Sequence, residues 1–189
     1  MAEGVFRSVA ASHPLIGEID SSGTAAYHAG EPPDIRTLNT LRRHGISNYQ
    51  HLAQRINVDH FLKNDYIIAM DDWNLSDLLR EKERVSASLS KASSSQTPST
   101  GRAATTTRSG SASALADAAS KTNSVAEVRL FGDFLPGGKL HERVGGGPAV
   151  QDPYYGGAQG FETVYGQVMQ FSKNFLQYLE RLHAGESQD

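Results

Sequence analysis

The 189-residue chain contains no cysteine, and this absence excludes several kinds of site. Disulfides, thiolate metal centres and a thiolate nucleophile all require a cysteine sulfur. A strong charge of one sign is also lacking, because 18 basic residues face 21 acidic ones, so neither nucleic acid nor a membrane surface is an expected partner. No apolar run approaches the ~20 residues of a membrane span. The first seven residues lack the basic start and apolar stretch of a signal peptide, so we expect a cytoplasmic protein.

Aromatic residues are absent and large aliphatic residues are scarce between residues 85 and 124, where serine, threonine and alanine dominate. Such a segment cannot bury enough apolar surface to offset the conformational entropy lost on ordering. We therefore predict a single α/β domain formed by residues 1–84 and 125–184, interrupted by a disordered insertion at 85–124 and followed by a tail at 185–189.

The remaining segments alternate between helical and extended patterns. The spacing of apolar residues and the capping residues predict helices over residues 1–11, 34–43, 57–63, 71–84 and 160–183 and strands over 15–20, 65–70 and 125–131. The strand at 65–70 is apolar on both faces, as strands of a parallel sheet are. This order predicts a three-layer α/β/α fold around a parallel sheet, in which ligands bind beyond the carboxyl ends of the strands.

The last predicted helix carries one apolar stripe with a spacing of three and four residues, which indicates a face that packs on the core. The stripe consists of Phe161, Val164, Val168, Phe171, Phe175, Leu179 and Leu182. Trp73 lies near the start of another predicted helix, and we expect it to pack as well.

A short loop after the last predicted strand, Asp152-Pro153-Tyr154-Tyr155-Gly156-Gly157, has the composition of a binding site. The proline favours an extended backbone at Asp152, and the glycines allow the chain to turn away. The loop would then present a carboxyl group beside two aromatic rings, as a site for an aromatic, charged substrate requires. The same residue types are common in surface turns, so a plain turn is the alternative.

Five segments, in this order, resemble the low-molecular-weight protein tyrosine phosphatases. They are residues 1–7 (MAEGVFR), 19–24 (IDSSGT), 30–34 (GEPPD), 65–71 (DYIIAMD, followed by Asn74 and Leu75) and 152–156 (DPYYG). The resemblance implies a phosphomonoester hydrolase that acts on phosphotyrosine proteins or small aryl phosphates, with no cofactor and no metal ion. In the family a cysteine thiolate attacks phosphorus, while a C-x5-R-S loop of backbone N–H groups at a helix N-terminus holds the phosphate.

The resemblance also implies roles for individual residues. Asp152 matches the general acid, which protonates the leaving phenolate and then activates water. Residues that match aromatic walls of the substrate site are Tyr27, Tyr154 and Tyr155. Ser21 and His51 match residues that support the phosphate loop. From local sequence alone, Ser21 could equally be a turn serine, His51 a solvated histidine and Tyr27 a half-buried packing ring.

The family's nucleophile lies just before its first helix, and this sequence begins within the position of that helix. We therefore expect this chain to lack the family's first strand and its phosphate loop, with the cysteine and the arginine of that loop. Because the first strand is central in the family's sheet, its absence would leave the neighbouring strands without a partner. Without the cysteine, we expect this chain to be inactive. Two explanations follow: an active phosphatase whose sequence is incomplete, which we favour, or a genuine short isoform or pseudophosphatase that acts as a binding or regulatory protein. The sequence supports no prediction of oligomeric state.

Overall fold

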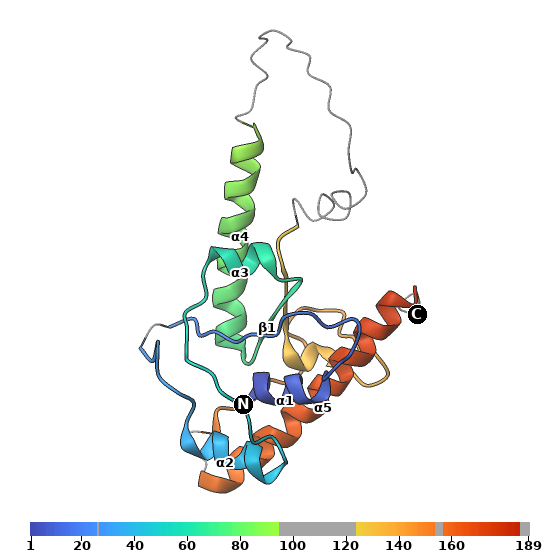
Figure 1. Cartoon of the computed structure of the whole chain (residues 1–189). Coiled ribbons are helices and arrows are strands. Elements are labelled where there is room, and N and C mark those ends of the chain that lie inside the picture. Colours follow the sequence, from blue (N-terminus) through green and yellow to red (C-terminus); the bar gives the residue numbers. More distant parts are fainter. Residues whose placement is uncertain (26, 95–123, 154–156, 186–189) are drawn as a thin grey trace, which may run out of the picture.

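The computed structural model describes residues 1–25, 27–94, 124–153 and 157–185. Its elements follow one another in the order shown in Figure 1. They are the helices α1 (Ala2–Val9), α2 (Ile35–Arg43) and α3 (Val58–Lys63), strand β1 (Tyr66–Ala69), helix α4 (Asp72–Ser94), strand β2 (Glu127–Leu130), the 3-10 helix η1 (Phe131–Asp133), strands β3 (Phe134–Leu135) and β4 (Lys139–Leu140), and helix α5 (Gly157–His183).

Two helices begin at the capping residues expected from the sequence. The Asp34 side chain accepts a hydrogen bond from the Arg36 backbone N at the start of α2. Asn57 caps α3 through a reciprocal pair of bonds with His60. In each case the side chain satisfies a backbone donor that a helix N-terminus leaves without an intrahelical acceptor.

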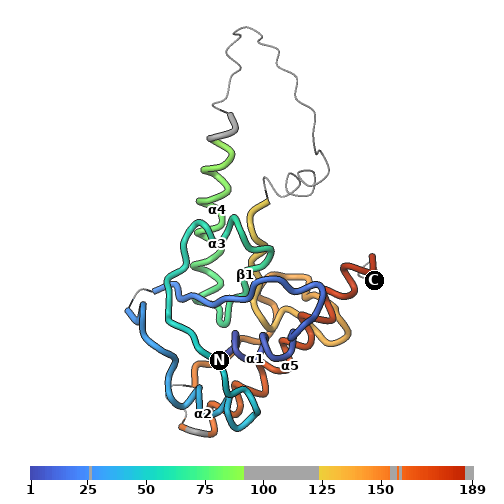
Figure 2. The backbone as a smooth tube through the Cα atoms, viewed as in Figure 1, coloured from blue at the N-terminus to red at the C-terminus, as the bar shows by residue number. Residues whose placement is uncertain are grey.

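The sheet of β1 and β2 is parallel, with Ile67 opposite Val128, and helices cover both of its faces. Alternation along β1 sends Tyr66 and Ile68 to one face, where α1, α2 and α5 contribute the core. Ile67 packs on the opposite face, against the core formed with α3 and α4. The predicted three-layer α/β/α arrangement is therefore confirmed, and the backbone trace in Figure 2 shows α1 lying against α5 on their common side.

One edge of β1 is unpaired in the described structure. The Glu127 backbone N donates to the Asp65 carbonyl, so the ladder uses the peptide groups of residues 65, 67 and 69, and those of Tyr66 and Ile68 point the other way. Among the described residues, these outward N–H and C=O groups have no hydrogen-bond partner. The edge of β1 opposite β2 is therefore open among the described residues, and its relation to an absent strand stays a prediction.

The structure corrects the prediction in several places. Residues 15–20 form no named strand, because an extended segment becomes a strand only when another strand pairs with it, and only Gly23 forms an isolated bridge, with Arg55. Residues 132–150, for which no helix or strand is predicted, contain the β3–β4 hairpin, turned by Gly137 and Gly138, both at positive φ. Trp73 does not pack, since it is 84% exposed.

The predicted boundary of the insertion is also wrong. Helix α4 continues to Ser94, because Val85 is buried and Leu89 packs on the α3–α4 core. Residues 95–123 lie outside the described residues, so the predicted disorder stays a prediction. The apolar stripe of α5 is buried or partly buried, as expected, except at its end, where Leu182 is exposed. Within the described chain, no helix combines the length and apolarity needed to span a bilayer.

Candidate functional site

A buried carboxylate on α1 joins three separate segments of the chain. The Glu3 side chain is only 1% exposed, and its Oε2 accepts a hydrogen bond from Ser21 Oγ at 2.5 Å and from the Tyr49 hydroxyl at 3.1 Å. His51 Nδ1 lies 3.1 Å from the same oxygen, and Arg7 Nε lies 2.9 Å from the other carboxylate oxygen, Oε1. The Oε2 atom of this buried carboxylate thus accepts two hydrogen bonds, whereas Oε1 forms the ion pair with Arg7 and accepts no hydrogen bond.

Ser21 and His51, predicted as supporting residues, meet in this network. Ser21 Oγ lies 3.4 Å from His51 Nε2, and the His51 side chain is 15% exposed. The alternative of a solvated histidine is therefore wrong, and Ser21 is more than a turn serine because its hydroxyl binds a buried carboxylate. Whether the two residues support a phosphate loop stays a prediction.

The backbone beside Ser21 is held by its own set of bonds. Asp20 accepts a hydrogen bond from the Ser21 backbone N at 2.9 Å and a second, short one from the Gln54 side chain. Gln54 also donates to the Ser21 carbonyl at 3.2 Å. These contacts fix residues 20–21 against residues 51–54 and so orient the Ser21 hydroxyl toward Glu3.

Tyr49, like Glu3, belongs to the network although no local sequence pattern singles it out. Burial, with a further contribution from the Glu3 charge, raises the pKa of the Tyr49 hydroxyl well above its usual range. The hydroxyl therefore stays protonated and donates to Glu3. Gly4 leaves room for the Tyr49 ring, because a Cβ at Gly4 would come within 3.2 Å of it.

The arrangement superficially contains a serine, a histidine and an acid, but the serine is not activated. A nucleophilic serine must give its proton to the histidine. Here the Ser21 hydroxyl donates to Glu3 at 2.5 Å and is 3.4 Å from His51. Glu3, Asp20 and His51 could also supply three ligand atoms to a divalent cation. The Arg7 guanidinium already neutralises Glu3, however, and opposes a second positive charge.

Asp152, the predicted general acid, lies on a different loop that is tied to the carboxyl end of the sheet. The Val150 backbone N donates to the carbonyl of Met70, the residue that follows β1, at 2.7 Å. Asp152 comes two residues later and is exposed. This is the edge of the sheet at which ligands bind in open parallel α/β folds.

A second carboxylate, which the sequence did not single out, holds the segment that leads to Asp152. Asp133 is fully buried and accepts hydrogen bonds from the backbone N of Gly145 at 2.8 Å and of Gly147 at 2.9 Å. It also accepts from the Leu130 backbone N at 3.2 Å. Asp133 thus connects the end of β2 to the loop that runs toward the predicted acid.

The predicted aromatic walls are described only in part. Tyr27 is 88% exposed, so the alternative of a half-buried packing ring is wrong. Tyr154 and Tyr155 lie outside the described residues. The structure therefore brings Ser21 and His51 together, places Asp152 at the carboxyl end of the sheet, and leaves the remaining site assignments as predictions.

Comparisons with known proteins agree with the resemblance read from the sequence. Residues 1–98 match the family model described as low molecular weight phosphotyrosine protein phosphatase. The protein of that name from Schizosaccharomyces pombe is 34% identical over 179 residues, which cover 93% of this chain and 85% of the relative. The Mus musculus protein of the same name is 31% identical, with coverage of 94% and 85%.

Solved structures show the same fold. A protein tyrosine phosphatase from Entamoeba histolytica, with Hepes in its active site, aligns with a TM-score of 0.61 at 23% identity, covering 98% of this chain and 89% of that one. A low molecular weight phosphotyrosine phosphatase from Vibrio cholerae gives 0.59 at 20% identity, with coverage of 96% and 88%. At these identities the likeness concerns the fold alone.

Proposed function

Because the chain belongs to the low molecular weight phosphotyrosine protein phosphatase family, we propose that it carries the acid and supporting residues of a phosphotyrosine-hydrolysing site but does not itself hydrolyse phosphomonoesters. The observation that carries this proposal is the absence of cysteine from all 189 residues. The family's reaction begins with attack of a cysteine thiolate on phosphorus. A serine is a poor replacement, because its hydroxyl needs an adjacent base, and Ser21 donates to a carboxylate that is already neutralised by other donors.

In the proposed site Asp152 is the general acid that protonates the departing phenolate. Its place at the carboxyl end of β1, fixed through Val150 and Met70, supports this role. Ser21 and His51 would support a phosphate loop, and Tyr27, with Tyr154 and Tyr155, would contact the aromatic ring of phosphotyrosine proteins or aryl phosphates. We also propose a cytoplasmic location, which fractionation of cells that express the protein would test.

The test compares two purified proteins with p-nitrophenyl phosphate and phenyl phosphate as substrates. The 189-residue chain should show no turnover above a blank. The same chain extended at its N-terminus by a strand and a C-x5-R-S loop of the family's pattern should hydrolyse both. Turnover by the unextended chain that survives repurification would refute the proposal.

The extended protein also tests the acid. Asp152→Asn should lower kcat for phenyl phosphate by roughly 10²–10⁴-fold, because an unprotonated phenolate leaves slowly. The effect on p-nitrophenyl phosphate should be smaller, since its leaving group needs less protonation. Equal losses on the two substrates would remove Asp152 from the role of proton donor.

The intact network around Glu3 favours a second candidate, a non-catalytic protein that binds phosphotyrosine. Trp73 is the only tryptophan and lies exposed in the first turn of α4, next to the carboxyl end of β1. Its fluorescence should therefore change saturably when a phosphotyrosine peptide binds at this end of the sheet. A response to the phosphorylated peptide and none to its unphosphorylated form, without turnover, would favour the binding protein.

A further inference from the structure

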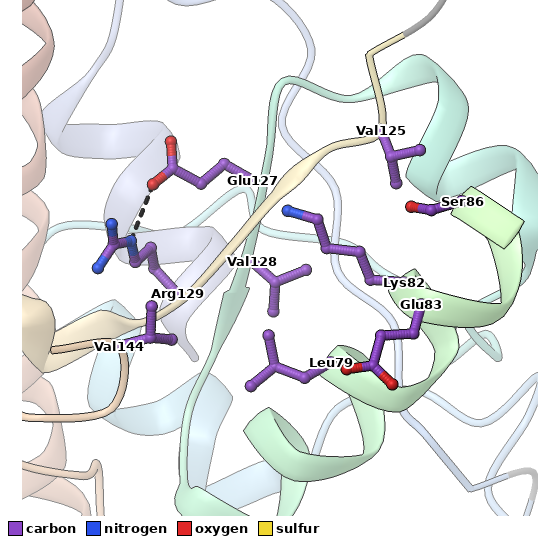
Figure 3. Close-up of a pocket in the computed structure, with 9 residues that line it drawn as sticks. All are labelled: Leu79, Lys82, Glu83, Ser86, Val125, Glu127, Val128, Arg129 and Val144. Carbon is purple, nitrogen blue, oxygen red and sulfur yellow. Dashed lines mark hydrogen bonds and ion pairs between the residues drawn. The ribbon is translucent and has the colours of Figure 1, made fainter. Parts of the chain in front are cut away.

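The two outer edges of the β1–β2 sheet differ in the side chains that accompany them. Strand β2 carries the charged residues Glu127 and Arg129, which pair at 2.8 Å, and Figure 3 shows Lys82 reaching from α4 toward this strand. Charged side chains on an edge strand oppose pairing with a further strand. Strand β1 has the sequence Tyr-Ile-Ile-Ala and carries no charge. Strand β2 therefore has the composition of an edge strand, and β1 has that of an interior strand.

The open edge of β1 presents hydrogen-bonding groups at a regular spacing. The peptide groups of residues 65, 67 and 69 face β2, so the N–H and C=O of Tyr66 and Ile68 point away from it. In the part of the chain that the structure describes, these four groups have no hydrogen-bond partner. A further strand of either direction could pair with them through every second residue of its own backbone.

The surroundings of β1 indicate which side chains such a strand would carry. Tyr66 and Ile68 pack on the core formed by α1, α2 and α5, and Ile67 packs on the core formed by α3 and α4. All three side chains are only partly buried, although helices lie on both faces of the sheet. A strand added beside β1 would send alternate side chains toward these two layers. Apolar residues on both of its faces would therefore suit the position.

Aspartates stand at both ends of β1. Asp65 directly precedes the strand, and Asp71 and Asp72 follow one residue after its end. Residues 64–79 contain four aspartates and no lysine, arginine or histidine. Lys63, which precedes this stretch, already forms an ion pair on α3. Basic residues at the two ends of an added strand would thus complement the charge at the two ends of β1.

We propose that the open edge of β1 binds an extended peptide that is apolar on both faces of its central residues and basic at both ends. The peptide would extend the sheet by strand addition, in which backbone hydrogen bonds supply affinity and side chains supply selectivity. A second copy of this chain fits less well, because both ends of its own β1 are acidic and edge-to-edge pairing would bring like charges together. The proposal does not depend on phosphatase activity, because its contacts are those of β1.

Fluorescence anisotropy of the full chain with three labelled peptides tests the proposal. The sequence KKVIVIVKK should bind saturably, and its counterpart EEVIVIVEE should bind at least about tenfold more weakly at low ionic strength because aspartates repel it. A third peptide repeats KKVIVIVKK with N-methyl groups on its three central residues. It stays extended but has lost N–H donors toward both of its edges, so its affinity should fall at least about tenfold.

Hydrogen exchange and two variants locate the binding. With KKVIVIVKK bound, the amides of Tyr66 and Ile68 should exchange at least about tenfold more slowly, whereas the amide of Ile67, which already bonds to β2, should change little. Asp72→Asn should weaken binding of this peptide by about two- to fivefold at low ionic strength. The matched control, Glu180→Gln, removes an exposed carboxylate near the end of α5 and should leave the affinity unchanged.

Four results would overturn the proposal. They are equal affinity for the N-methylated peptide, equal affinity for EEVIVIVEE, unchanged exchange at Tyr66 and Ile68, and equal effects of the two variants. Sedimentation of the free chain provides a further check, because a dimer in which the Tyr66 and Ile68 amides are already protected would show that a second copy occupies the edge. Each variant's amide spectrum reports whether it is folded, so a loss of binding through unfolding is recognised directly.

Discussion

Replacing Glu3 by glutamine should destabilise the protein far more than the same replacement on its surface. The carboxylate is 1% exposed and holds residues 20–21 and 49–51 on α1 through Ser21, Tyr49 and His51. Glutamine keeps the shape but has one acceptor oxygen and an NH₂ group. If the oxygen faces Ser21 and Tyr49, the NH₂ group faces the guanidinium of Arg7, a contact between two donors.

The size of the effect follows from these contacts. A hydrogen bond to a charged group contributes about 1.5–3 kcal/mol, and a bond to a neutral amide oxygen contributes roughly half as much. Weakening the bonds from Ser21 and Tyr49 in this way therefore costs about 1.5–2 kcal/mol in total. The Arg7 pair adds at most ~1 kcal/mol because its guanidinium is half exposed. The total is about 2–3 kcal/mol, which corresponds to a fall in Tm of roughly 4–12 °C for a chain of this size.

The assay is urea and thermal unfolding followed by far-UV circular dichroism, with Glu180→Gln as the matched control. Glu180 is exposed and, among the residues that the structure describes, pairs only with His13, at 3.0 Å, so its replacement should cost less than about 0.5 kcal/mol. A double-mutant cycle adds Tyr49→Phe, and the two losses should couple by about 1 kcal/mol because the residues share a hydrogen bond. Equal losses in Glu3→Gln and the control, or strict additivity in the cycle, would refute the network.

Three further predictions concern other parts of the molecule. Hydrogen bonds from His44 and Arg43 are the chief cause that lowers the pKa of Glu162, so its contribution to stability is present above the unfolded-state pKa, near 4.5, and is lost as the pH falls through the lower folded-state pKa. In urea titrations, Glu162→Gln should therefore be less stable than the wild type at neutral pH and equally stable near pH ~3. The control Glu142→Gln should be as stable as the wild type at both pH values. In native-state hydrogen exchange, the amide of Ile67, which donates to β2, should be protected from exchange, while the amide of Ile68 at the open edge of β1 should exchange at least about tenfold faster. Equal protection of the two amides would show that this edge of β1 is paired. Asp133→Asn should lower the free energy of unfolding by about 1–3 kcal/mol in the same urea assay, because one of the three backbone N–H donors then faces an NH₂ group. A decrease below ~0.5 kcal/mol would mean that these hydrogen bonds do not hold the loop after β4.

The sequence predicts this fold best where one local pattern decides the structure. The stripe of α5 has one buried face, and the apolar run of β1 suits a strand covered on both sides, so both elements were found. Residues 15–20 also carry apolar side chains, at Leu15, Ile16 and Ile19, but pairing depends on a neighbouring strand that local sequence does not encode. The β3–β4 hairpin does have a sequence signal, the Gly137-Gly138 pair between short apolar segments, but the same pair is equally typical of a loop.

The buried network was only half predictable for a similar reason. Ser21 and His51 were found because they match a family pattern, whereas Glu3 in the first turn of α1 has the sequence of an ordinary solvent-facing helix acid. Its partners Ser21 and Tyr49 lie 18 and 46 residues away. No local window contains both, so only the fold shows that the acid is buried.

The residues that hold the fold differ from the proposed general acid, and this separation bears on the two candidate functions. The network of Glu3 connects three segments, so it would persist in a protein that has lost all chemistry. Asp152 is exposed and follows a loop that Asp133 and Met70 hold. Conservation of the network alone in related cysteine-free chains would therefore be expected for a binding protein. Retention of Asp152 is better explained by a proton-transfer role, and this favours an acid that works together with a nucleophile.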